Sequence, residues 1–128
     1  MFFLSRLSLS EEYHYVAWLK VFGSLFFFSL ILNLAVWILI LTQIGKFEAD
    51  IPLHYNIYFG IDNFGSKNDL YFLPIFASIV LVINFLISLY SFFKEKMLTY
   101  FLVGGSILVQ ILALLASIAI ILLNLYRL

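Results

Sequence analysis

The chain of 128 residues is 65% hydrophobic, 20% aromatic and only 11% charged, with a net charge of zero and no cysteine. Soluble domains are roughly half apolar and about a quarter charged, so this composition excludes a soluble domain and predicts an integral membrane protein. The neutral charge gives no basic surface for nucleic acid, and the missing cysteines exclude disulfides and thiolate metal sites.

Long stretches without any charged residue mark the predicted transmembrane helices. Such stretches separate the following pairs of charged residues: Lys20 and Lys46, Asp69 and Lys94, and Lys96 and Arg127. Each is longer than the roughly 20 apolar residues that cross a bilayer core of about 30 Å. We therefore predict an all-α membrane protein, a three-helix bundle with spans at residues 20–44, 70–93 and 97–126 of one domain, 1–128.

Residues 1–19 are predicted to form an amphipathic lead-in at the membrane interface. Ser8 or Ser10 can cap a helix whose first turn holds Glu11 and Glu12, where acidic side chains complement the helix dipole. This helix can continue directly into the first span.

The short turn at residues 94–96 makes the second and third spans antiparallel neighbours. The amino-terminal side carries Arg6, Lys20, Lys94 and Lys96, against Lys46, Lys67 and Arg127 on the other side. Because cytoplasmic loops carry the excess of Lys and Arg, we predict a multi-pass protein of the inner (plasma) membrane with a cytoplasmic amino terminus and an extracytoplasmic loop at 45–69.

Each span carries one large amide near its middle: Asn33, Asn84 and Gln110. We expect the three amides to lie at a similar depth near the bilayer centre. Each belongs to a stripe of small and polar residues on one helix face. The stripes are Ser29, Asn33, Val36, Ile40 and Gln43; Ala77, Leu81, Asn84, Ser88 and Ser91; and Ser106, Gln110, Ala113, Ser117 and Asn124.

Two interpretations of these stripes stay open. In the first, the amides hydrogen-bond across helix interfaces and hold the bundle together. In the second, they line a polar path for an ion or small solute, formed within an oligomer. The spans contain no ionisable residue, which argues against a pump or coupled transporter.

The loop at 45–69 has the pattern of a folded cap. Residues 53–59 alternate, with Leu53, Tyr55, Ile57 and Phe59 on one face, which predicts a half-buried strand. Gly60, then Asp62-Asn63 and Gly65-Ser66, supply turn residues. We expect a compact, partly extended loop packed on the helix ends, with its apolar face on the membrane surface.

The loop also carries a motif: Pro52, His54, Tyr55, Asn56, Gly60, Asp62, Phe64, Gly65, Ser66 and Lys67. It resembles the signature of the small bacterial domain of unknown function that opens the SdpI-type immunity proteins, a His-aromatic-Asn triplet followed by Asp-x-aromatic-Gly-Ser-Lys. The resemblance covers roughly residues 45 to 95. Gly60 stands one position later than in the family pattern, and family members with an immunity function have more helices.

The motif has a structural and a functional interpretation. Structurally, His54, Asp62, Ser66 and Lys67 would hydrogen-bond one another and fix the turns of the loop. Functionally, the loop would recognise an extracytoplasmic peptide, a toxin or a lipid headgroup. One imidazole with scattered carboxylates makes a poor metal site, and His54 has no nucleophile or oxyanion donor to serve as a general base. We therefore predict no catalysis, no metal and no cofactor.

The predicted function is that of a non-enzymatic, immunity-like or recognition protein that acts through the 45–69 loop. The alternatives are an oligomeric channel or transporter component lined by the amides, and a structural subunit of a membrane complex. The predicted partners are the lipid bilayer, an extracytoplasmic peptide, and further copies or another membrane protein.

Overall fold

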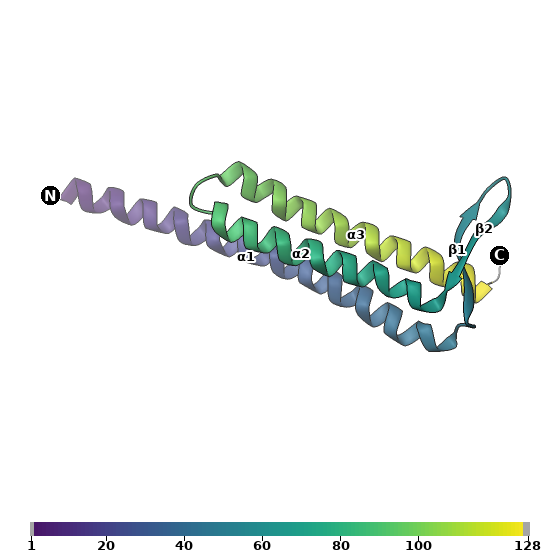
Figure 1. Ribbon diagram of the computed structural model, residues 1–128. Helices are drawn as coiled ribbons and strands as arrows, with labels where there is room; N and C mark the ends of the chain where they lie inside the picture. The colour runs from purple at the N-terminus through teal and green to yellow at the C-terminus, as the bar shows by residue number, and fades with distance from the viewer. Residues whose placement is uncertain (1, 127–128) are drawn as a thin grey trace.

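The computed structural model describes residues 2–126, with the side chains of residues 11–61 and 63–126. It is a bundle of three helices with a β-hairpin between the first two (Figure 1). The elements are α1 (Phe2–Gln43), the short 3-10 helix η1 (Ile44–Lys46), β1 (Asp50–Asn56), β2 (Gly60–Ser66), the 3-10 helix η2 (Lys67–Tyr71), α2 (Phe72–Ser91) and α3 (Lys96–Tyr126). The predicted three-helix bundle is confirmed, and a small antiparallel sheet is added to it.

Three helical segments are long and apolar enough to cross a membrane, namely Glu11–Lys46, Lys67–Ser91 and Lys96–Tyr126. Their large apolar side chains are mostly exposed on the outside of the bundle, as expected where lipid surrounds them. The chain is therefore a multi-pass membrane protein. Pro74 lies in the first turn of α2, where its missing N–H costs least.

The first helix has no break between the predicted lead-in and the first span. It runs for 42 residues, or about 63 Å at 1.5 Å per residue, and its amino-terminal part continues past the turn between α2 and α3 (Figure 1). The predicted helix start at Ser8 or Ser10 is wrong, because both residues lie inside α1. Residues 2–19, the predicted lead-in, therefore continue the first transmembrane helix along the same axis.

The third helix is central to the packing, because α1 and α2 each contact α3 more extensively than they contact one another. The predicted stripes lie on the buried helix faces, although Gln43, Asn84 and Asn124 are only half-buried. Buried positions include Ser29, Asn33, Val36 and Ile40 of α1, Ala77, Leu81, Ser88 and Ser91 of α2, and Ser106, Gln110, Ala113 and Ser117 of α3. Small side chains at these positions let the helix backbones approach closely.

Aromatic rings close the end of the bundle at the α2–α3 turn. Trp18 of α1 lies against Phe92 and Tyr100, with ring centroids 5.3 Å and 4.5 Å away. Phe92 also contacts Phe22 at 5.1 Å. Amphipathic rings at this level are typical of the membrane–water interface.

The opposite end of the bundle carries the hairpin. Its strands pair in antiparallel register from Asp50 with Ser66 to Asn56 with Gly60, with an irregularity around His54. Residues 57–59 form the turn, so the predicted strand over 53–59 is wrong in its second half. The loop is partly extended, as predicted, and its base packs on the helix ends. Its turn projects sideways beside the last turns of α3 (Figure 1).

Candidate binding site

The base of the hairpin is attached firmly to the bundle. Ile51 at the start of β1 and Leu70 of η2 are buried in one apolar cluster with residues of the helices. The Asn124 side-chain amide donates to the carbonyl oxygen of Pro52 at 3.0 Å and to that of Ile120 at 2.8 Å. The hairpin is thus tied to α3 by packing and by a hydrogen bond.

The second strand ends in a capping box. The Ser66 side chain accepts a hydrogen bond from the Asn68 N–H at 3.3 Å, and the Asp69 carboxylate accepts one from the Ser66 N–H at 3.0 Å. Ser66 is therefore engaged with the next turn of chain. The predicted hydrogen bonds among His54, Asp62, Ser66 and Lys67 stay a prediction. Asp69 was missed by the sequence analysis, although the spacing Ser-x-x-Asp before an apolar helix is a capping signal.

Gly65 is fixed at this position by its surroundings. A Cβ added there would overlap the Leu53 side chain and lie 2.8 Å from Asp69 Oδ2. A larger residue there would force the Leu53 side chain and the capping carboxylate to move. This motif residue therefore has a structural role.

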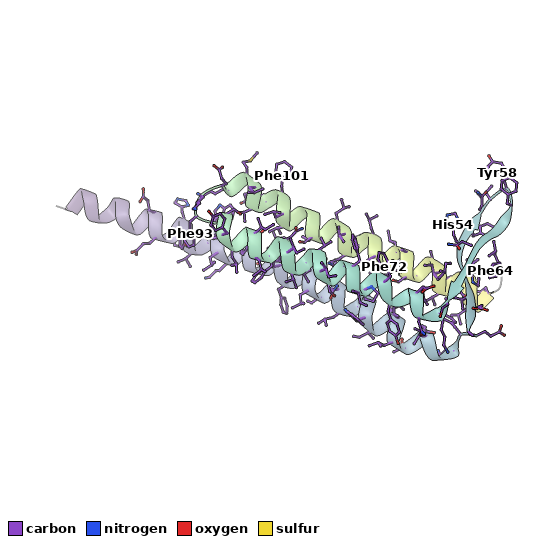
Figure 2. The ribbon with its side chains drawn as sticks, in the orientation of Figure 1. His54, Tyr58, Phe64, Phe72, Phe93 and Phe101 are labelled. Atoms are coloured by element: carbon purple, nitrogen blue, oxygen red, sulfur yellow. The ribbon has the colours of Figure 1, made fainter. Side chains whose placement is uncertain are left out.

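Asn56 and Gly60 shape the hairpin turn. The Asn56 side-chain oxygen accepts a hydrogen bond from the Tyr58 N–H at 2.9 Å, and Gly60 has a φ of 75°, which favours glycine. The side chains between them are almost fully exposed, at 84% for Ile57, 87% for Tyr58 and 84% for Phe59. Figure 2 shows Tyr58 at the outer end of the hairpin and Phe64 nearer its base.

A cavity of about 450 Å³ opens between the base of the hairpin and the helix ends. Its lining includes Lys46, Glu48, Asp50, Ile61, Phe64 and Asn124. Phe64 is 63% exposed and so offers its ring to any molecule that enters. This cavity, which we call the end pocket, combines both signs of charge with apolar surface.

The remaining motif residues are spread along the hairpin. Pro52 and Phe64 pair across the strands beside the end pocket, whereas exposed His54 pairs with Asn63 and lines a groove against α3 together with Tyr55. Lys67 begins η2, and the Asp62 side chain lies outside the part of the structure described. Among the described side chains, no group of three His, Cys, Asp or Glu could hold a metal ion.

Within the bundle, Asn33 and Gln110 join all three helices. Asn33 Nδ2 donates to Gln110 Oε1 at 3.0 Å, and Gln110 Nε2 donates to the carbonyl oxygen of Ala77 at 2.8 Å. Ser78 Oγ lies 3.0 Å from Asn33 Oδ1 and accepts from Trp37 Nε1 at 3.0 Å. We call this network the amide clasp.

Asn84 does not join the amide clasp. Its side-chain amide contacts the carbonyl oxygen of Leu102 at 3.2 Å and Ser106 Oγ at 3.1 Å. Asn84 follows Ala77 by seven residues, about 10 Å along α2, so the expected common depth of the three amides is wrong. Trp37 and Ser78 were missed because each stands one position beside the predicted stripes; only the three-dimensional packing shows that they meet.

Comparisons of the chain with models of protein families, with curated proteins and with solved structures find no match. The resemblance of the loop motif to the SdpI-type immunity proteins therefore stays a prediction.

Proposed function

We propose that this protein is a non-enzymatic protein of the bacterial plasma membrane that binds an extracytoplasmic peptide in the end pocket, in the manner of an immunity protein. In this proposal the amino terminus is cytoplasmic and the hairpin lies outside. The larger number of Lys and Arg residues on the side of the 92–95 turn supports that orientation.

The observation that carries the proposal is the chemistry of the end pocket. A binding site for a peptide needs a concave surface with apolar contacts and polar groups that orient the ligand. Here Phe64 and Ile61 supply apolar surface, while Lys46 and Asp50 supply opposite charges. A peptide, which has apolar side chains and charges of both signs, matches this combination.

The attachment of the hairpin also supports binding. Asn124, the capping box and buried Ile51 hold the pocket walls in place before any ligand arrives. A pocket that is already ordered loses less conformational entropy on binding than a flexible loop would. The resemblance of the motif to immunity proteins is consistent with a peptide toxin as the ligand.

The channel alternative finds less support. Gln110 is fully buried, and both of its side-chain polar atoms are used in the amide clasp, as are those of Asn33. Amides that satisfy one another inside a single chain favour the interpretation that they hold the bundle together. The proposal of a structural subunit rests on no specific contact.

A protection assay tests the proposal. Sensitive bacteria that express the protein would be exposed to a panel of secreted membrane-active peptide toxins, and survival would be compared with that of cells carrying an empty vector. We expect protection against at least one peptide, and we expect Phe64→Ala to remove it at unchanged protein abundance.

Phe101→Ala is the matched control, because Phe101 is also an exposed phenylalanine and lies at the far end of the bundle (Figure 2). It should protect as well as the unmodified protein. Equal survival with both variants, or no protection by the unmodified protein, would contradict binding in the end pocket.

A further inference from the structure

We propose that the hairpin tip, defined as Ile57, Tyr58 and Phe59, inserts its side chains into the interface of the surrounding lipid leaflet, beside α3. The tip would thus be a membrane anchor for the hairpin. This inference concerns a surface other than the end pocket, and it rests only on the bundle crossing the membrane.

The composition of the turn is the first observation. Hairpin turns that face water are built from polar and small residues. Here Asn56 and Gly60 perform the turn chemistry at the two ends, and the three residues between them are all large and apolar. Among the apolar residues whose exposure is described, these three side chains are the most exposed. Such an apolar surface fits a site that lipid covers.

The position of the tip along the bundle is the second observation. Leu53, His54 and Tyr55 border a groove of about 700 Å³ whose other wall is formed by Ala116, Ala119 and Leu123 of α3. Ala116 lies about 15 Å before the end of α3, at 1.5 Å per residue. Strand β1 therefore runs beside the last turns of the span, and the tip follows directly after it.

The direction of the hairpin agrees with this position. Figure 1 shows that the strands run across the direction of the bundle and that the turn lies to the side of α3. The hairpin does not extend the bundle beyond the helix ends. The helix surface beneath the hairpin is one that faces lipid, since Leu115 and Leu122 are exposed there. The apolar tip and the lipid-facing helix surface are thus on the same side of the molecule.

The backbone sets the depth that the tip can reach. A two-stranded hairpin has unpaired N–H and C=O groups along both edges, which need water or headgroups as partners. The strands must therefore stay in the headgroup region while only the tip side chains extend toward the acyl chains. Tyr58 suits this boundary, because its ring is apolar and its hydroxyl can remain hydrated.

Single-cysteine variants test the proposal directly, because the chain has no cysteine of its own. Tyr58→Cys would be labelled with a nitroxide, reconstituted at low density in phosphatidylcholine–phosphatidylglycerol liposomes, and examined by electron paramagnetic resonance. We expect the label to be more accessible to oxygen, which partitions into lipid, than to a water-soluble nickel chelate.

Two control variants define the limits of this measurement. Leu115→Cys places a label on the lipid-facing surface of α3, and Asn68→Cys places one on the exposed η2 turn. The accessibility of the Tyr58→Cys label should lie between those of the two controls and closer to that of Leu115→Cys. A label as accessible to nickel as that of Asn68→Cys would overturn the proposal.

A second copy of the chain could also shield the tip from the nickel chelate. Two labels would then lie close together and give spin–spin broadening that disappears on dilution with unlabelled protein. Such broadening would also overturn insertion into lipid. Ile57→Cys and Phe59→Cys should repeat the result of Tyr58→Cys, so that one perturbed label cannot decide the outcome.

Discussion

Asn124 Nδ2, near the end of α3, donates a hydrogen bond to the carbonyl oxygen of Pro52 in β1 at 3.0 Å, across 72 positions of sequence. The two residues couple the last turns of a transmembrane helix to the hairpin outside it. This contact, together with buried Ile51, sets where the hairpin stands relative to the bundle.

Asn124→Ala should loosen the base of the hairpin without unfolding the bundle. A typical net hydrogen bond contributes about 1 kcal/mol, so the β1 amides should exchange with solvent roughly fivefold faster. Hydrogen–deuterium exchange by mass spectrometry in nanodiscs measures this change. Asn68→Ala removes an exposed asparagine side chain near the same place and should leave the β1 exchange rates unchanged. A β1 rate unaffected by Asn124→Ala would contradict the predicted coupling.

The amide clasp should show energetic coupling between Asn33 and Gln110. Leu in place of either amide leaves the other one short of a partner inside the bundle, which should cost about 1 kcal/mol of unfolding free energy in a membrane protein. The double variant should lose clearly less than the sum of the two single losses. Unfolding free energies measured in bilayers or mild detergent give this coupling.

Asn84→Leu is the matched comparison for that cycle, because Asn84 shares no hydrogen-bond partner with Asn33. The losses of Asn33→Leu and Asn84→Leu should therefore add. Additive losses for Asn33 and Gln110 would show instead that the clasp has no cooperative role.

Gly65→Ala should disrupt the hairpin, since the added methyl group meets Leu53 and the Asp69 carboxylate. We expect faster proteolysis between β1 and β2 in liposomes, with the transmembrane helices still protected. Leu53→Ala combined with Gly65→Ala should restore part of the protection by making room. Gly104→Ala is the control, because a Cβ there meets nothing within 4 Å, and equal proteolysis of the two single variants would refute the role assigned to Gly65.

The orientation of the protein can be tested with Asn63→Cys and Glu95→Cys, both at exposed positions at opposite ends of the bundle. A membrane-impermeant maleimide added to intact cells should label Asn63→Cys and leave Glu95→Cys unlabelled until the membrane is opened. Labelling of Glu95→Cys in intact cells would reverse the proposed orientation and place the hairpin in the cytoplasm.

The helices could be predicted from the sequence because membrane spans are defined by long uncharged stretches, and the amide stripes identified the buried faces. The sequence could not show that Asn33 bonds Gln110 and not Asn84, because all three amides were predicted at one depth. Small shifts between neighbouring helices decide which polar groups meet. Trp37 and Ser78 could not be assigned to the network without knowing these shifts.

The hairpin was only partly predictable. Alternation over Leu53–Phe59 indicated a strand, yet Asn56 ends it because its side chain bonds the turn backbone at Tyr58. Its projection to the side of α3 depends on the distant contact with Asn124, and no local pattern in the loop carries that information. The end pocket likewise exists only once η1, the hairpin and α3 are brought together.

The central place of α3 has a consequence for how the protein assembles during synthesis. Gln110 completes the contacts of Asn33, and Asn124 completes those of Pro52, yet both partners leave the ribosome after the segments that they hold. The first two helices contact one another less than either contacts α3, so we expect their association to tighten only when α3 is inserted. We therefore expect closure of the bundle and packing of the hairpin base to be late, coupled events.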